Sequence, residues 1–151
     1  MIVVDTNVLI DVAQINPLWA DWSLEQLQIQ GTVHELVINP VIYAELAVNY
    51  SSREKLDAEM ARLDLDFQEL PRLALHLAGQ AYGRYRRQGG TKLNVLPDFF
   101  IGAHAAVSRC AVLTRDPHRY RSYFPAVELI TPEAPWDGFS VHEPRMSYLY
   151  E

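Results

Sequence analysis

Residues 2–7 read Ile-Val-Val-Asp-Thr-Asn, so that a short β-branched run ends at three polar residues. A run of this kind is typical of a buried strand, and the polar triplet, with Thr6 or Asn7 as the cap, is typical of a helix start. Similar apolar runs return at residues 36–38, 111–114 and 127–130. These four runs predict strands of a mainly parallel sheet that is buried on both faces.

Helical patterns separate the predicted strands. We expect helices over residues 16–31, 41–48, 53–70, 73–85 and 98–108, and short helices after Asp5 and Asp116. This alternation predicts an α/β fold, a three-layer α/β/α sandwich whose mainly parallel sheet has about four to five strands. The sequence shows no internal repeat or linker. We therefore expect one domain over residues 1–132 and a tail of unassigned role over residues 133–151.

Composition excludes several classes of protein. The 151 residues are 49% hydrophobic and 21% charged, which excludes a disordered, collagen-like or disulfide-scaffold chain. Cys110 is the only cysteine, so no internal disulfide can form, and its apolar neighbours predict a buried thiol in a reducing compartment, the cytoplasm. The N-terminus lacks the basic and apolar regions of a signal peptide, and no uncharged run approaches about 18 residues. We expect neither export nor a membrane span.

Charge is distributed unevenly along the chain. The formal net charge is −6, from 13 basic and 19 acidic residues, which by itself argues against a polyanionic partner. Residues 72–121, however, hold nine of the basic residues and only two acids, Asp98 and Asp116. A basic stretch that keeps two carboxylates suggests a polyanion site with a metal centre. The alternative is a solvated helix face that balances an acidic neighbour.

Four acids fall just after predicted strands or in the first turns of predicted helices: Asp5, Glu45, Asp98 and Asp116. Open α/β sheets bind ligands outside the carboxyl ends of their strands, where these acids would share one pocket. Like charges about 4 Å apart cost on the order of 1 to 4 kcal/mol per pair, so the cluster must take up protons, disperse or bind a hard cation. Mg²⁺ or Mn²⁺ suits carboxylate oxygens, and either ion supports phosphodiester hydrolysis.

Each acid also has an ordinary structural explanation. Asp5 could form an N-cap cluster with its two polar neighbours. Asp116, which precedes a proline, has the pattern of a helix start. Glu45 could lie on a solvated helix surface, although its neighbours are apolar or small, and Asp98 could cap the helix that it opens.

Four motifs, taken in order, resemble PIN-domain ribonucleases, specifically the VapC-type toxins of toxin–antitoxin modules. The motifs are Ile-Val-Val-Asp-Thr-Asn-Val-Leu-Ile-Asp at 2–11, Pro-Val-Ile-Tyr-Ala-Glu-Leu at 40–46, Leu-Pro-Asp-Phe-Phe-Ile-Gly-Ala-His-Ala at 96–105 and Leu-Thr-Arg-Asp-Pro-His-Arg-Tyr at 113–120. The resemblance covers roughly residues 1–132, and the ordered set is far more specific than Asp-Thr-Asn alone.

This resemblance implies metal-dependent endonucleolytic cleavage of RNA, with Mg²⁺ or Mn²⁺ as the cofactor. It implies an acidic quartet that is catalytic and binds the metal: Asp5, Glu45, Asp98 and Asp116. Asp5 and Asp98 are its principal metal ligands, and the other two acids complete the site or position water. It also implies three polar groups that orient the acids or the phosphate: Thr6, Asn7 and Thr114.

Partners follow from the same resemblance. It implies an RNA substrate, a cognate antitoxin protein, and a homodimer or a higher toxin–antitoxin complex in a prokaryotic cytoplasm. The basic residues expected to contact RNA phosphates are Arg84, Arg86, Arg87, Lys92 and Arg115. The alternative for the first four is a solvated helix end. His104, six residues after Asp98 on one predicted helix, should point away from the metal and is interpreted as structural.

Three competing functions share an acidic pocket. A phosphatase of the haloacid dehalogenase type normally needs a second acid two residues after the first, where this chain has Asn7. A receiver-like domain places a lysine after its last strand, and residues 129–132 supply none. A catalytically inactive PIN-like binding module would keep all four acids, so only an activity assay separates it from the ribonuclease.

Overall fold

A computed structural model of the chain describes residues 1–132, and the predicted tail over residues 133–151 lies outside the described residues. Within residues 1–132, five strands form one all-parallel sheet in the order β3-β2-β1-β4-β5. The strands are β1 (Ile2–Val4), β2 (Leu36–Ile38), β3 (Leu65–Phe67), β4 (Ala111–Leu113) and β5 (Leu129–Ile130). The predicted α/β class and the size and direction of the sheet are confirmed.

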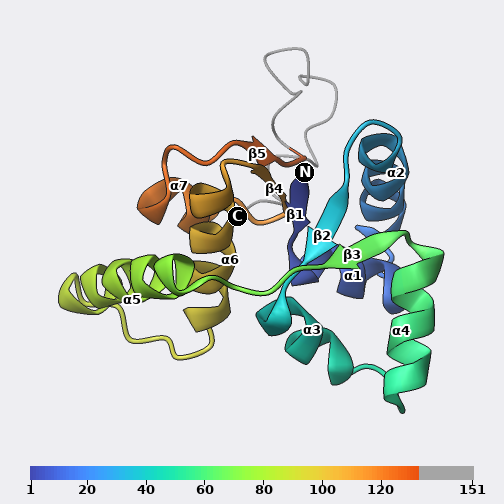
Figure 1. Ribbon diagram of the computed structural model, residues 1–151, viewed down its shortest axis with the longest axis horizontal. Helices are drawn as coiled ribbons and strands as arrows, with labels where there is room; N and C mark the ends of the chain where they lie inside the picture. Colours follow the sequence, from blue (N-terminus) through green and yellow to red (C-terminus); the bar gives the residue numbers. More distant parts are fainter. Residues whose placement is uncertain (133–151) are drawn as a thin grey trace.

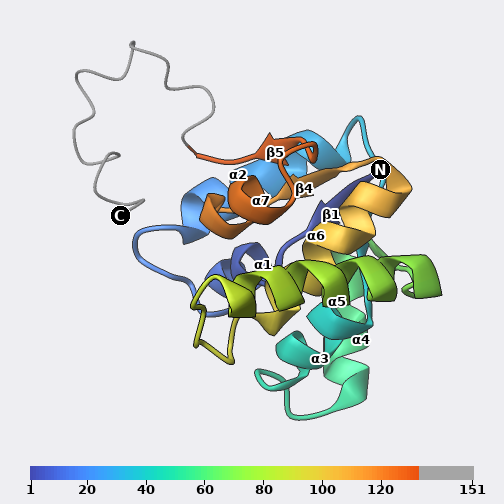
Figure 2. The same cartoon turned by 90° about the vertical axis from the view of Figure 1, so that its left-hand side faces the viewer.

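Helices cover both faces of this sheet. They are α1 (Thr6–Ala13), α2 (Ala20–Gly31), α3 (Pro40–Ala47), α4 (Arg53–Arg62), α5 (Arg72–Arg87), α6 (Leu96–Ser108) and α7 (His118–Tyr123). On one side α6 packs on β1 and β4 and is backed by α5, whereas on the other side α2 packs on β2 and α1 packs on α2 (Figure 1). Figure 2 looks onto the first side, with α5 lying across α6. The three predicted layers are therefore present.

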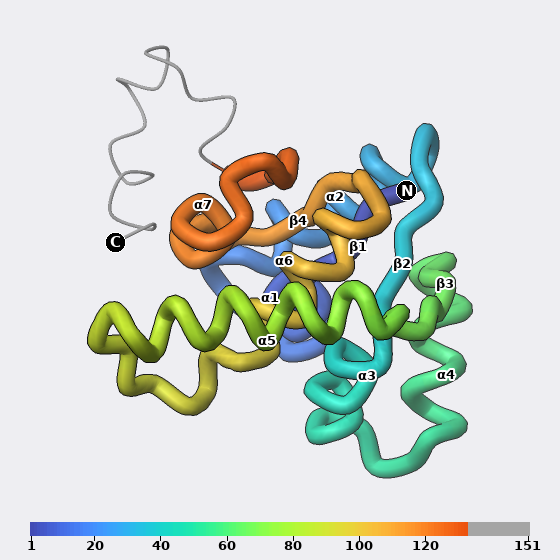
Figure 3. The backbone as a smooth tube through the Cα atoms, turned by 60° about the vertical axis from the view of Figure 1, so that its left-hand side comes forward, coloured from blue at the N-terminus to red at the C-terminus, as the bar shows by residue number. Residues whose placement is uncertain are grey.

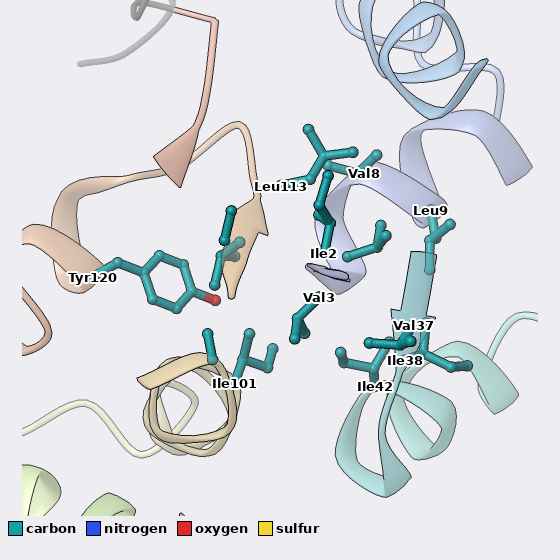
Figure 4. Close-up of a cluster of buried hydrophobic side chains, with 14 of the residues drawn as sticks. Ile2, Val3, Val8, Leu9, Val37, Ile38, Ile42, Ile101, Leu113 and Tyr120 are labelled. Carbon is teal, nitrogen blue, oxygen red and sulfur yellow. The ribbon is translucent and has the colours of Figure 1, made fainter. Parts of the chain in front are cut away.

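The short strands are held mainly by side-chain packing. Val3, Val37 and Val112 of the three central strands are fully buried, and Figure 4 shows strand side chains gathered with Ile42 of α3 and Ile101 of α6. Full burial of an apolar side chain contributes about 1.5 to 3 kcal/mol. Burial on both faces explains why the strands have continuous apolar runs rather than alternating polar and apolar residues.

A glycine allows α7 to approach α6. Helix α7 packs against α6 and lies beside the C-terminal half of α5 (Figure 3). A Cβ atom on Gly102 of α6 would overlap the ring of Phe124, the residue that ends α7. Any larger residue at position 102 would therefore force the Phe124 ring to move.

One predicted helix is wrong. The pattern over residues 53–70 predicted a single helix, but α4 ends at Arg62 and residues 65–67 form the edge strand β3. Asp64 adopts a positive φ of 56°, which ends the helix. Leu65 then pairs in register with Leu36 of β2. A three-residue strand is too short to show a period of its own, so the preceding helical spacing obscured it.

Two helix starts are set by asparagine side chains. The Asn16 side chain accepts hydrogen bonds from the backbone N–H groups of Leu18 and Trp19, at 2.9 and 3.0 Å. This turn delays α2 to Ala20, later than the sequence pattern predicted. Asn39 caps α3 by accepting from two backbone N–H groups of its first turn, at 3.0 Å each.

Cys110 is half-buried rather than buried as predicted. It follows Arg109, the left-handed residue that ends α6, and precedes β4, so part of its side chain remains accessible. No helix within residues 1–132 is both long enough and apolar enough to cross a membrane.

Candidate active site

The order in which the strands are added to the sheet reverses at β1. The chain builds β2 and β3 on one side of β1 and then crosses to the other side for β4 and β5. Open parallel sheets bind ligands at such a switch point, outside the carboxyl ends of the strands. Asp5 directly follows β1 and Thr114 directly follows β4. The backbone N–H of Asp5 donates to the carbonyl of Leu113 at 2.9 Å, which ties the two strand ends together.

The Asp5 carboxylate is buried and tightly held. Its Oδ2 atom accepts hydrogen bonds from the Tyr120 hydroxyl at 2.8 Å, the Thr114 hydroxyl at 2.9 Å and the Asn7 amide at 3.4 Å. Asp5 occupies the N-cap position of α1 but makes no side-chain capping bond. The explanation of residues 5–7 as a simple N-cap cluster, with Thr6 or Asn7 as the cap, is therefore wrong.

The electrostatic environment of Asp5 favours its protonated form. Burial, followed by the charges of Asp98 and Glu45, raises the pKa of Asp5 from 3.8 to about 7, although hydrogen bonds from Tyr120 and Thr114 act in the opposite direction. Three of the four predicted acids therefore influence one another across the switch point. A carboxylate with this pKa readily exchanges its proton for a cation near neutral pH.

Asp98 lies in the first turn of α6, facing α7. Its Oδ2 atom accepts a hydrogen bond from the Arg119 guanidinium at 2.9 Å. Burial raises its pKa from 3.8 to about 6, the contact with Arg119 lowers it, and the charges of Asp116 and Glu45 raise it. Because α6 begins at Leu96, Asp98 is not the cap of this helix.

Glu45 and Asp116 complete the group of four acids that includes buried Asp5 and half-buried Asp98. Glu45 is half-buried on α3 and accepts a hydrogen bond from the Thr6 hydroxyl at 2.6 Å, so it does not lie on a freely solvated helix surface. Asp116 is exposed, and its backbone N–H donates to Thr114 Oγ1 at 3.0 Å. Pro117, not Asp116, is the N-cap residue of α7. The explanation of Asp116 as a helix cap is therefore wrong.

The donor chemistry of the site fits a hard cation. The four acids offer carboxylate oxygens, and hydroxyl groups lie between them, which is the ligand type of Mg²⁺ and Mn²⁺. Within residues 1–132, no three His, Cys, Asp or Glu side chains are arranged so that they could hold a metal ion as they stand. Asp98 is instead paired with Arg119. The assignment of the quartet as metal ligands stays a prediction.

Tyr120 is a site residue that the sequence analysis missed. Figure 4 shows it reaching from α7 into the core with its hydroxyl oxygen directed inward, where it donates to Asp5. Burial and the charges of Asp5 and Asp98 raise its pKa well above 10, so the hydroxyl keeps its proton and remains a donor. The one available signal was its spacing, four residues or about one helical turn after Asp116.

Arg119 is also closer to the site than sequence reasoning indicated. It pairs with Asp98 and lies over the Tyr85 ring, with its guanidinium carbon 5.8 Å from the ring centroid. Its position in sequence, three residues after Asp116, gave no indication of a contact with Asp98, which lies on another helix.

His104 is structural, as predicted. Its ring is buried, with Nδ1 3.1 Å from the Asn39 amide nitrogen and Nε2 3.4 Å from the Gln68 amide oxygen. Burial lowers its pKa, which favours the neutral ring. These contacts join α6 to the residues that follow β2 and β3.

A second ionic cluster supports the loop between β4 and α7. Asp11 of α1 is fully buried and accepts hydrogen bonds from the Arg115 guanidinium at 2.7 Å and the Ser23 hydroxyl at 3.1 Å. The Arg115 guanidinium also lies over the Trp19 ring, 5.5 Å from its centroid. The Arg115 backbone N–H donates to the Asn7 side chain at 3.3 Å. Arg115, predicted to contact RNA, is thus already engaged in holding the loop that carries Asp116.

Replacing Arg115 by alanine should lower the free energy of unfolding by about 3 kcal/mol, because it leaves the buried Asp11 carboxylate without its cation. In a domain of this size the melting temperature should fall by roughly 5 to 10 °C. Thermal unfolding followed by circular dichroism measures this change. Arg53→Ala is the matched control, since Arg53 pairs with Asp57 at the surface, and should change stability by less than about 0.5 kcal/mol. Equal losses in the two variants would contradict the structural role of Arg115.

The other predicted basic residues lie at one end of α5 and in the loop after it. Arg84, Arg86 and Arg87 are exposed in the last turn of α5, and Lys92 is exposed in the following loop. Arg86 donates to the Tyr82 hydroxyl at 3.3 Å. This placement agrees both with contacts to RNA and with a solvated helix end, so their role in RNA binding stays a prediction.

Comparison with solved structures identifies the same fold in bacterial complexes. VapBC2 from Rickettsia felis, bound to a DNA fragment from the promoter, aligns with a TM-score of 0.67 and 17% identity over 87% of this chain and 98% of that chain. DNA-bound VapBC from Salmonella typhimurium aligns with a TM-score of 0.65 and 18% identity, over 86% of this chain and 96% of that chain. VapBC-1 from nontypeable Haemophilus influenzae aligns with a TM-score of 0.65 and 18% identity, over 87% of this chain and 98% of that chain. Among curated proteins none matches this chain.

A family-level match covers the whole candidate site. Residues 2–124 match the model of the PIN domain. This span begins at β1, ends just after α7 and contains all four predicted acids. The haloacid dehalogenase and receiver-like alternatives find no support in these comparisons. The chain belongs to the PIN domain family.

Proposed function

We propose that this protein is a Mg²⁺- or Mn²⁺-dependent endoribonuclease that cleaves RNA phosphodiester bonds, and that it is the toxin of a toxin–antitoxin pair. The observation that carries the proposal is a pair of neighbouring carboxylates, buried Asp5 and half-buried Asp98, at the switch point of a PIN-family sheet. Two like charges held this close, one of them buried, are costly unless a cation neutralises them. The likeness to VapBC complexes supports the toxin assignment.

The site's own residues divide into ligands and groups that orient them. The proposed ligands are Asp5, Glu45, Asp98 and Asp116. A bound divalent ion would neutralise charge on the attacked phosphate and lower the pKa of a bound water. Three donors converge on Oδ2 of Asp5 and fix the direction of its carboxylate. Thr6 restrains Glu45 in the same way, and Thr114 holds the backbone of Asp116.

Substrate and partners extend this proposal. We propose that phosphates of the RNA contact the exposed basic residues Arg84, Arg86, Arg87 and Lys92, with an affinity that falls as salt rises. Arg115 mainly holds the loop between β4 and α7 through its ion pair with Asp11, and only its exposed part can contact a phosphate. A cognate antitoxin, a homodimeric or higher assembly and a location in a prokaryotic cytoplasm complete the proposal. Residues 1–132 are the proposed nuclease domain, and residues 133–151 are a tail of unassigned role.

Cleavage of RNA by the purified, antitoxin-free protein tests this function. Total tRNA and ribosomal RNA should give discrete fragments in Mg²⁺ or Mn²⁺ and none in EDTA, because the carboxylates alone cannot neutralise charge on the phosphate. Denaturing gel electrophoresis resolves the fragments. Cleavage that persists in EDTA would contradict metal dependence, and an absence of cleavage under every condition would contradict the nuclease.

An inactive PIN-like binding module is the second candidate. The ion pair between Arg119 and Asp98 favours it, since a cationic side chain already neutralises one of the two aspartates. The two candidates differ in turnover. Folded protein that binds metal and RNA but leaves the RNA intact would establish the binding module.

A further inference from the structure

A pocket between α5 and α7 lies beside the candidate active site. Its volume is about 310 Å³, and its walls come from the last turns of α5 and from α7. Figure 3 shows α7 lying beside the C-terminal half of α5, so the two helices can form opposite walls. Pockets that take small organic ligands begin at about 300 Å³. The volume is therefore large enough for more than an inorganic anion.

Its lining holds two arginines and a histidine. Arg84 enters from α5, and His118 and Arg119 enter from α7. Of the described residues that line this pocket, none is acidic. Arginine binds phosphate through charge-assisted and often bidentate hydrogen bonds. The pocket thus has the chemistry of a phosphate site inside a protein whose formal net charge is −6.

Aromatic rings supply the remaining surface. Tyr85 and Tyr123 both line the pocket, with ring centroids 6.0 Å apart at 78°. The Tyr123 hydroxyl donates to the Gln88 amide oxygen at 2.7 Å, and the Tyr85 hydroxyl accepts the backbone N–H of Lys92 at 3.1 Å. These bonds hold the rings in place before any ligand binds. Aromatic side chains beside cations commonly contact the bases of single-stranded nucleic acid.

Arg119 connects this pocket to the acidic site. Its guanidinium donates to Asp98 at 2.9 Å and lies over the Tyr85 ring of the pocket. A ligand in the pocket is therefore one side chain away from a carboxylate of the proposed catalytic site.

We infer that this pocket binds a nucleotide of single-stranded RNA adjacent to the phosphate that is cleaved, with Arg84 and His118 on its phosphate and the tyrosines against its base. The inference rests on the proposed function and names the part of the substrate that this surface recognises. Arg119 spans the boundary between the nucleotide and the acidic quartet. Arg86 and Arg87, which do not line the pocket, are left as peripheral phosphate contacts.

RNA binding measured without cleavage tests the inference. The probe is a fluorescein-labelled, mixed-sequence single-stranded 10-mer RNA, and its Kd is measured by fluorescence anisotropy in EDTA over a series of KCl concentrations. Arg84→Ala should raise the Kd about fivefold and reduce the slope of log K against log salt by roughly 0.7, the value for one phosphate contact on a single strand. His118→Ala should also weaken binding. Arg72→Ala, on the exposed first turn of the same helix, is the matched control and should change the Kd by less than about twofold.

Competition identifies which part of the nucleotide is bound. Adenosine monophosphate should displace the RNA at a lower concentration than inorganic phosphate, because only the nucleotide contacts the tyrosines. Arg84→Ala should raise the concentration of adenosine monophosphate required. Equal displacement by the two anions would overturn the nucleotide assignment.

The outcomes separate this inference from the proposed function. Wild-type protein that cleaves RNA, together with an Arg84→Ala variant that binds like Arg72→Ala, would overturn the pocket and leave the nuclease. Binding that depends on Arg84 without metal-dependent cleavage would support the pocket and overturn the nuclease. Wild-type protein that does not bind RNA would overturn both. Unchanged melting temperatures of the variants establish that each change in Kd is local.

Discussion

Asparagine in place of Asp98 should reduce RNA cleavage by on the order of 10³-fold, the size of effect seen when one charge-stabilising group is removed from an active site. Asparagine has nearly the same shape, and its amide oxygen can still accept the hydrogen bond from Arg119. The variant loses the negative charge and keeps the packing. Single-turnover cleavage of a defined RNA in Mg²⁺ measures the loss, and Asp5→Asn should behave in the same way.

The fold of these variants should be preserved. Asp5 and Asp98 raise each other's cost of ionisation, so neutralising one of them relieves repulsion in the metal-free protein. Asp66→Asn is the matched control, because Asp66 is exposed on the edge strand β3, away from the switch point. It should leave the cleavage rate within about twofold. An Asp98→Asn variant that cleaves within tenfold of the wild-type rate would place Asp98 outside the reacting site.

Mg²⁺ or Mn²⁺ should raise the melting temperature of the wild-type protein by roughly 5 to 10 °C. A ligand at about 100 times its Kd adds about 2.7 kcal/mol to the free energy of unfolding when it binds only the folded state, and this corresponds to several degrees in a domain of this size. Differential scanning fluorimetry in MgCl₂ or MnCl₂, against KCl at equal ionic strength, measures the shift. Asp98→Asn should show a smaller rise, and Asp66→Asn should show the full rise.

The rise in melting temperature that the metal causes should depend on pH. In EDTA, Asp5 and Asp98 hold protons in the folded state up to pH values of about 7 and about 6, whereas in the unfolded chain they lose them near 3.8. The folded state therefore binds more protons between these values, and the free energy of unfolding falls as the pH rises through this window. Metal binding needs ionised carboxylates, so the metal-induced rise should be larger at pH 8 than at pH 5.5. A metal-independent melting curve at pH 8 would contradict the site.

The sequence by itself determined the fold class of this protein. The runs at residues 2–4, 36–38 and 111–113 are continuously apolar and buried. A strand of this composition must be covered on both faces, so helices have to pack on each side of the sheet. In a parallel sheet the residues after each strand lie at the carboxyl edge, so the sequence alone was enough to assign Asp5 and Asp116 to that edge. The sequence did not predict β3, because three residues are too few to show a period against the helix pattern before them.

Tertiary structure alone decided what holds the acids. Tyr120 and Arg119 lie 115 and 21 residues from the aspartates that they contact, and nothing in their own sequence neighbourhood records those contacts. Arg115 is a further example. Its charge suggested a contact with phosphate, but in the folded protein it forms an ion pair with the buried Asp11. Periodicity and spacing report local conformation and strand direction. Hydrogen bonds between distant side chains depend instead on how α6 and α7 pack on the sheet, which the one-dimensional pattern does not encode.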